Sequence, residues 1–154
     1  MDDIAAARAV HVLAVLFWIG GVAFVTLVVM PAILREHPPG ERLAAFHRIE
    51  RGFAPQARLW VLLAGASGFW MTHRAGLWDR FVDPGFWWMH AMVGLWAVFM
   101  AMLFVIEPLF LHRRFRAAPD PEALFDRMIR MHRLLLAITV VTVLGATAGS
   151  HGLI

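Results

Sequence analysis

Histidine is the residue type in this sequence whose number and spacing best suit chemistry. The chain of 154 residues contains 8 histidines and no cysteine. Neutral imidazole is a good ligand for haem iron, copper and zinc, and a b-type haem needs only two such rings on facing helices. The lack of cysteine excludes disulfides, thiolate metal sites and covalently attached c-type haem. We therefore expect any haem or metal site to be built around histidine.

Four hydrophobic stretches must position these histidines. Hydrophobic residues make up 60% of the chain and charged residues 16%, whereas a soluble domain has roughly 25% charged residues. A membrane helix needs about 20 mainly apolar residues. Stretches of that kind cover residues 9–34, 55–73, 86–111 and 128–150. We predict one all-α domain over residues 1–154, an integral membrane bundle of four antiparallel transmembrane helices.

The loop between the first two stretches, residues 35–54, has a helical pattern of its own. Apolar residues recur at helical spacing among its charges, at Leu43, Phe46, Ile49 and Phe53. The pattern predicts a short amphipathic helix, either at the cytoplasmic membrane surface or as a turn capping the bundle. Pro55 would then occupy the first turn of the second membrane helix.

All 14 basic residues are arginine, and most of them lie at two of the three loops. Only Arg8, Arg74 and Arg80 lie away from the first and third loops and their flanks. The positive-inside rule places arginine-rich loops in the cytoplasm, so we expect both termini on the outer, periplasmic side of a bacterial inner membrane. Arginines beside hydrophobic stretches indicate membrane topology rather than nucleic-acid binding.

With this topology the histidines divide into two layers. The outer layer has one histidine from each helix: His11, His73, His90 and His151. The cytoplasmic layer contains His47, His112 and His132. His37 lies beside Pro38, and we expect it to be solvated. At about 1.5 Å per residue the layers are roughly 30 Å apart, so one cofactor takes its ligands from one layer.

These features also have purely structural interpretations. A histidine near a helix end can hydrogen-bond to water or lipid headgroups, so the prediction of a site depends on four histidines sharing one layer. Gly145 and Gly149 match the GxxxG pattern of helix packing, which serves contacts within the chain or between copies in a homo-oligomer. The remaining small residues would suit a porphyrin slot: Gly20, Gly21, Gly65, Gly68 and Gly94.

Tryptophan is the second residue type of interest. Trp18 follows His11 by seven residues, about two helical turns, so the two face the same way. Trp18 would pack on a porphyrin face or belong to the ordinary core. The tryptophans near the outer boundary predict an aromatic belt: Trp70, Trp78, Trp87 and Trp88.

Glu107 is the one carboxylate well inside a hydrophobic stretch, and the helix-kinking Pro108 follows it. A buried charge needs a partner, and Arg58 lies at similar depth on the second helix, so we predict a Glu107–Arg58 ion pair. Proton transfer or contact with a quinone is the functional alternative for these two residues.

The first helix carries the clearest family resemblance. It reads HVLAVLFWIGG over residues 11–21, with Pro31 further on. Together with Arg51, Phe53 and the glycines of residues 65–68, this pattern resembles the copper resistance protein D-like family of bacterial membrane proteins. The resemblance covers helices one to three.

The same first helix is similar to the HemJ-type protoporphyrinogen oxidases. In those enzymes the helix-one histidine is a haem ligand and a helix-three lysine is required. The resemblance implies that His11 is a haem ligand here. The lysine is absent, and His90 lies in the comparable region, a departure that fits a bis-histidine haem better than the oxidase activity.

These observations predict a membrane-embedded b-type cytochrome with one or two haems. His11 and His90 would ligate a haem in the outer layer, while His73 and His151 would complete a second haem or metal site or line an access route. A haem held by His132 with His112 or His47 is a further arrangement. Electrons would pass from a membrane donor, such as a quinol, to a periplasmic redox partner.

Three alternatives stay open. The outer histidines, with Met71, Met89 and Met92, would instead bind copper, because thioether ligands suit Cu(I), although methionine also fills gaps in apolar cores. A porphyrin-oxidising enzyme is the second alternative. A structural or assembly subunit without a cofactor is the third.

Overall fold

The computed structural model describes residues 2–111 and 120–153, and this part of the chain is helical and contains no strand. The long segments are α1 (Asp2–Phe24) with η1 (Val25–Val29) and α2 (Met30–Glu36), then α3 (Arg42–Arg74), α4 (Trp87–Ala101) with η5 (Met102–Leu111), and α6 (Pro121–Ser150). Short 3₁₀ turns connect them: η2 (Pro39–Glu41), η3 (Leu77–Phe81) and η4 (Pro84–Phe86).

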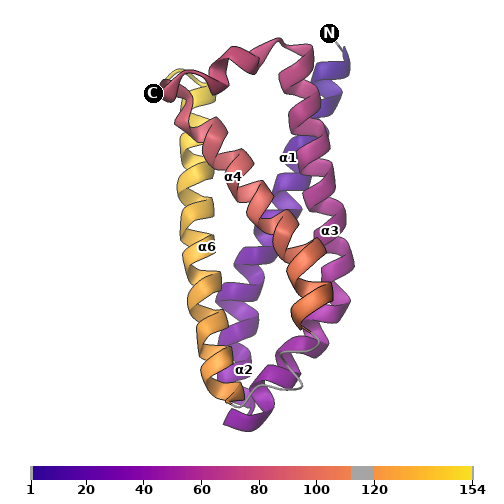
Figure 1. The fold of residues 1–154 in the computed structure, drawn as a ribbon, viewed down its shortest axis with the longest axis vertical. Coiled ribbons are helices and arrows are strands. Elements are labelled where there is room, and N and C mark those ends of the chain that lie inside the picture. The colour runs from indigo at the N-terminus through magenta and orange to yellow at the C-terminus, as the bar shows by residue number, and fades with distance from the viewer. Residues whose placement is uncertain (1, 112–119, 154) are drawn as a thin grey trace.

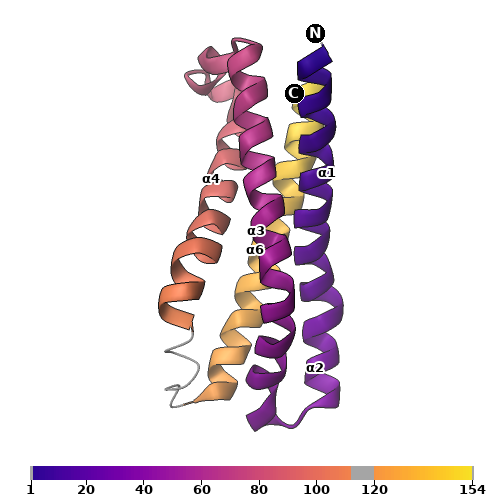
Figure 2. The same cartoon turned by 90° about the vertical axis from the view of Figure 1, so that its right-hand side faces the viewer.

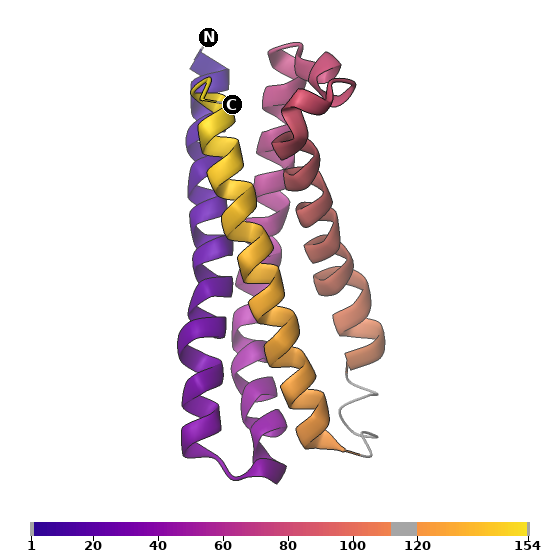
Figure 3. The same ribbon diagram turned by 90° about the vertical axis from the view of Figure 1, so that its left-hand side faces the viewer.

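The long helical segments run side by side, with both termini at the same end of the molecule (Figure 1). The α2–α3 connection lies at the opposite end (Figure 2). α4 crosses obliquely from the terminal end of α6 towards α3, and η5 continues it along α3 (Figure 1 and Figure 3). The described segments therefore form an antiparallel bundle with a terminal end and a loop end.

Three of these helical segments are long and apolar enough to cross a membrane: Asp3–Glu36, Pro84–Glu107 and Pro121–Ser150. Large apolar side chains stay exposed along them, including Leu16, Leu27, Leu134 and Leu144. In water such a surface would be unfavourable, whereas lipid accommodates it. The prediction of an all-helical fold is confirmed for the described residues, and three of the predicted spans are long and apolar enough to cross a membrane. α3 is not among the three candidate spans in the described residues.

The start of the second helix differs from the prediction. α3 runs without a break from Arg42 to Arg74, so the expected amphipathic segment is its first part and Pro55 lies inside the helix. A proline at that position removes a backbone hydrogen bond. Leu43 and Phe46 before it and Ala57 after it are buried, and burial of these apolar side chains offsets the loss.

Two π-helical segments adjoin prolines. η1 ends two residues before Pro31, and η5 contains Pro108. A proline has no backbone N–H and clashes with the preceding turn, which favours a wider turn. In the π pattern, the N–H that would bond to the Leu103 carbonyl belongs to residue 108. That carbonyl accepts a hydrogen bond from Arg58 Nε instead, at 3.1 Å.

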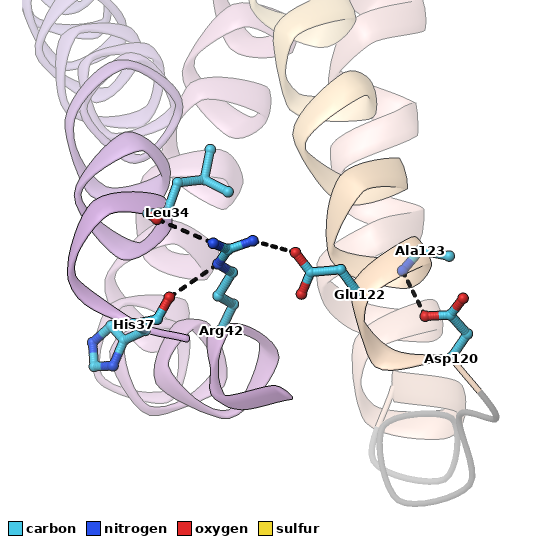
Figure 4. A network of polar contacts seen from close by, with 6 residues as sticks. All are labelled: Leu34, His37, Arg42, Asp120, Glu122 and Ala123. Carbon is cyan, nitrogen blue, oxygen red and sulfur yellow. Dashed lines mark hydrogen bonds and ion pairs between the residues drawn. The ribbon is translucent and has the colours of Figure 1, made fainter. Parts of the chain in front are cut away.

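The loop end is held together by one arginine (Figure 4). Arg42 Nε donates to the His37 carbonyl at 3.1 Å and its NH2 group to the Leu34 carbonyl at 3.3 Å. Its NH1 group donates to the Glu122 carboxylate. Arg42 thus caps the carboxyl end of α2 and links it to the first turn of α6.

At three glycines of the helix interfaces, an aromatic ring from α4 packs against the Cα and fills the space that a porphyrin slot would need. A Cβ on Gly145 or Gly149 would collide with the ring of Trp87 or Trp88, respectively. Gly65 admits the Trp96 indole, whose Nε1 donates to the Val61 carbonyl at 3.0 Å. These three glycines therefore let α4 approach α6 and α3. Trp88 is buried, so the prediction that it belongs to an exposed aromatic belt is wrong.

Candidate functional site

A cavity of about 850 Å³ lies at the terminal end of the bundle. Side chains from α1, α3, η3, α4 and α6 line it, and we call it the histidine cavity because His11 and His151 are both on its wall. Its volume lies within the range of roughly 300–1,000 Å³ typical of small-molecule and cofactor sites. Its other polar or aromatic lining residues include Arg8, Trp18, Arg80 and Trp96.

His11 is fixed by the neighbouring helix. Its Nδ1 lies 2.9 Å from the Ala64 carbonyl oxygen and 3.1 Å from Ser67 Oγ. The Ser67 hydroxyl donates in turn to the Leu63 carbonyl, so Oγ is an acceptor towards the ring. Two acceptors at Nδ1 place the imidazole proton there, which leaves the lone pair on Nε2. Gly68 allows the ring this close, because a Cβ there would lie 3.1 Å from His11 Cε1.

His151 has the same arrangement at the end of α6. Its Nδ1 lies 2.8 Å from the Thr147 carbonyl oxygen and 3.2 Å from Ser150 Oγ. The proton therefore lies on Nδ1, and Nε2 carries the lone pair that a metal ligand needs. His11 and His151, from near opposite ends of the sequence, thus line one cavity, and each ring keeps its lone pair on Nε2.

The other two histidines of the predicted outer layer are placed differently. His90 Nε2 lies 2.9 Å from the Phe81 carbonyl oxygen and its Nδ1 3.3 Å from that of Phe86, so both ring nitrogens face acceptors. Neither His90 nor His73 lines the histidine cavity. Both are exposed at the terminal end, as His151 is. The geometry therefore favours His11 with His151 over His11 with His90.

A second cavity, of about 300 Å³, lies nearer the loop end. We call it the carboxylate cavity because Glu50 and Glu107 line it, together with His132 and Arg127. Apolar side chains from α1, η1, α3, η5 and α6 form the rest of the wall. Trp18 lines both cavities, and its Nε1–H is buried without a hydrogen-bond acceptor in the described structure.

The predicted pair of Glu107 and Arg58 is present. Arg58 NH2 donates to Glu107 Oε1 at 3.0 Å, while Glu107 Oε2 is buried without a partner among the described residues. The second carboxylate oxygen of Glu107 therefore has no donor among the described residues.

The two described histidines of the predicted cytoplasmic layer, His47 and His132, are placed differently. His132 lines the carboxylate cavity, with Nδ1 2.9 Å from the Met128 carbonyl oxygen. His47 lies outside that lining, with Nδ1 3.4 Å from Glu50 Oε2. His112 lies outside the described residues, and the half-buried His37 gives its backbone carbonyl to Arg42.

Glu50 is the site residue that sequence reasoning missed. The sequence pattern groups it with the charges of an amphipathic helix, yet it shares a face with Phe46, Phe53 and Ala57, which also line the cavity. Burial, reinforced by the charge of Glu107, raises the pKa of Glu50 to about 7. The spacing of Glu50 could have indicated this position, because a residue four places after Phe46 lies on the same apolar face of the helix.

In the described residues, no three His, Asp or Glu side chains form a group that would hold a metal ion by themselves. No protein-family model, no curated protein and no solved structure matches this chain.

Proposed function

We propose that this chain is a membrane-embedded b-type cytochrome that binds one haem in the histidine cavity and transfers electrons. His11 and His151 are the proposed axial ligands. One observation carries the proposal: both histidines line the same 850 Å³ cavity, and in both a carbonyl oxygen holds Nδ1, so that Nε2 is free to ligate. The first-helix resemblance, which implies that His11 is a haem ligand, agrees with this assignment.

The remaining lining residues fit a porphyrin. Arg8 and Arg80 supply positive charge for the two propionates, and neither has a carboxylate partner among the described residues. Trp18 and Trp96 supply aromatic surface, and the unpaired Trp18 Nε1–H would donate to an acceptor on the ligand. When bound, the haem would supply a one-electron carrier, and two histidine ligands suit electron transfer because they leave no open coordination position.

The membrane placement is part of the proposal. We take residues 55–73 of α3 as a fourth span, with the termini on the periplasmic side of a bacterial inner membrane. Pairing of Arg58 with Glu107 supports this, because it removes the main obstacle to placing that part of α3 in lipid. The histidine cavity would then lie near a periplasmic redox partner and the carboxylate cavity near the cytoplasm.

A reduced-minus-oxidised visible spectrum of the detergent-purified protein tests the proposal, with pyridine haemochrome quantitation. We expect one b-type haem per chain, lost in His11→Ala and in His151→Ala. His90→Ala and His73→Ala are the matched controls and should retain it. A colourless protein after haem-supplemented expression would reject the proposal, and haem loss in His90→Ala alone would reject the ligand assignment.

Copper binding is the second candidate. All three methionines singled out in the sequence, Met71, Met89 and Met92, line the histidine cavity with His11 and His151. Thioether and imidazole together suit Cu(I). Cu(I) titration against a competing chelator distinguishes the two: tight copper binding that Met89→Leu with Met92→Leu abolishes, in a protein without haem, would favour copper.

A further inference from the structure

The carboxylate cavity has the properties of a ligand site separate from the histidine cavity. It lies between η1, α3, η5 and α6, and its walls are aliphatic and aromatic. Three of its lining residues, Ile49, Ile106 and Met131, are also exposed on the outside of the bundle. A ligand that enters the cavity past these residues would meet apolar side chains. This suits a molecule that arrives from the lipid.

Two residues of this lining, Glu107 and His132, each have a hydrogen-bond acceptor without a partner in the described residues. Glu107 uses Oε1 to accept from Arg58 and leaves the buried Oε2 without a partner in the described residues. His132 directs Nδ1 at the Met128 carbonyl and stacks edge-on against Phe46, with the ring centroids 5.9 Å apart. Its proton therefore lies on Nδ1, and Nε2 is an acceptor. A ligand that satisfies both must donate two hydrogens.

The polar groups of the cavity favour a neutral ligand. Glu107 Oε1 already accepts from Arg58, so an anion would meet an acceptor rather than a donor at the remaining oxygen. Arg127 also lines the cavity, but this residue is exposed, so solvent screens its charge. Glu50 adds a carboxyl whose pKa burial raises to about 7, so it carries a full charge only above that pH. A cation would have to share the carboxylate with Arg58. A neutral aromatic diol meets none of these penalties.

We propose that the carboxylate cavity binds the ring of a lipid-soluble hydroquinone, whose hydroxyl groups donate to Glu107 Oε2 and His132 Nε2. The proposal rests on the proposed cytochrome function for the ligand's role as an electron donor, whereas binding itself does not require the haem. Trp18 lines both cavities, so it would lie between the hydroquinone and the haem.

The first test uses unaltered protein and two matched probes. Duroquinol has two hydroxyl donors, and its dimethyl ether has the same ring without them. Under anaerobic conditions, calorimetric titration in detergent should show duroquinol binding at least about tenfold tighter than the ether, the effect expected for a hydrogen bond to a charged acceptor. Equal affinities, or no binding of either probe, would overturn the proposal.

Variants separate this inference from the cytochrome proposal. His132→Phe keeps the ring packing on Phe46 and should lose duroquinol binding while retaining haem. His11→Ala should lose haem while retaining duroquinol binding. If His132→Phe binds duroquinol as the unaltered protein does, the site assignment is wrong even where haem is present. Haem-free protein that still discriminates duroquinol from its ether upholds this inference and rejects the cytochrome.

Glu107→Gln gives a reversal that misfolding would not produce. The amide oxygen of this variant can still accept from Arg58, and its NH2 group then turns a donor towards the cavity. Duroquinol binding should weaken about tenfold, whereas duroquinone, which offers carbonyl acceptors, should bind tighter than before. An unchanged preference would contradict the role of Glu107.

Discussion

At the scale of single residues, the position of one proton decides which histidines can act as ligands. In His11, His132 and His151, Nδ1 donates to a backbone carbonyl, so the lone pair of Nε2 is available to a ligand. His90 has carbonyl oxygens at both ring nitrogens, so ligation would cost it the 2.9 Å contact to Phe81. His11, His90 and His151 share the residue type and the terminal end of the bundle, and hydrogen bonding separates His90 from the other two.

Glu50 gives a stability prediction with a definite pH dependence. Its folded pKa is raised from 4.5 to about 7, so between these values the folded protein binds more protons than the unfolded chain. Stability is therefore lost as pH rises through this window, by up to about 3 kcal/mol. Other titratable or charged groups at the site are His47 beside it, Glu107 from η5, and Arg127 and His132 from α6.

Glu50→Gln should remove this loss. We expect its melting temperature in detergent to exceed that of the unaltered protein at pH 8 and to approach it at pH 5. Glu36→Gln, at an exposed position on α2, is the control and should follow the unaltered protein. Parallel melting curves for the protein and Glu50→Gln across pH 5–8 would contradict the burial of this carboxyl.

At the scale of elements, the α4–α6 contact depends on glycine. Alanine at position 149 would place a methyl group against the rigid Trp88 indole, which is buried. Overpacking of this kind costs about 1–3 kcal/mol, so Gly149→Ala should lower the melting temperature. Gly94→Ala is the matched control, because no atom lies within 4 Å of the added Cβ and alanine favours a helix. Equal melting temperatures for the two variants would refute the contact.

Arg42 makes a second prediction at this scale. It joins α2 and α6 through two carbonyls and one carboxylate, and its side chain is 19% exposed. Arg42→Ala should destabilise the protein by about 1–2 kcal/mol, since a largely buried charged donor is lost. Arg48→Ala, which removes an exposed arginine from the same helix, should have little effect on thermal unfolding in detergent.

The length of the apolar stretches predicted the helices more reliably than the residues expected at helix starts. Apolar length located helices around residues 9–34, 86–111 and 128–150, because lipid imposes that length. Helix starts were predicted less reliably: α6 begins at Pro121, before the predicted residue 128, with Asp120 accepting from the Ala123 N–H, and Pro55 lies inside α3 rather than in a first turn. Cross-helix packing decides the second case, and it is not encoded locally.

The candidate site residues show the same difference between features that are encoded locally and features that depend on packing between helices. The Glu107–Arg58 pair could be predicted, because a buried charge requires a partner within reach. The placement of His11 and His151 on one cavity wall without His90 could not be predicted, because it depends on the contacts of His90 with the Phe81 and Phe86 carbonyls. The position of Glu50 in the cavity wall could not be predicted either, because it depends on α3 continuing through residue 55.

At the scale of the whole molecule, the two ends differ in charge and chemistry. Both termini and the η3–η4 connection lie at the end with the histidine cavity (Figure 1). The α2–α3 connection and the start of α6 lie at the opposite end (Figure 2). Most arginines of the described residues lie in or beside these segments in the sequence: Arg35, Arg42, Arg48, Arg51, Arg127 and Arg130. The positive-inside rule then predicts that the histidine cavity faces the periplasm.

Cysteine labelling tests this orientation directly, because the chain has no native cysteine. Val82 and Leu153 are highly exposed at the terminal end, and Gly40 is exposed in the α2–α3 connection with open space around its Cα. On intact bacterial cells a membrane-impermeant maleimide should label Val82→Cys and Leu153→Cys, and should label Gly40→Cys only after the membrane is opened. The reverse pattern would place the histidine cavity on the cytoplasmic side. Labelling of Gly40→Cys and Val82→Cys from the same side would mean that α3 does not cross the membrane, and the fourth span would have to be abandoned.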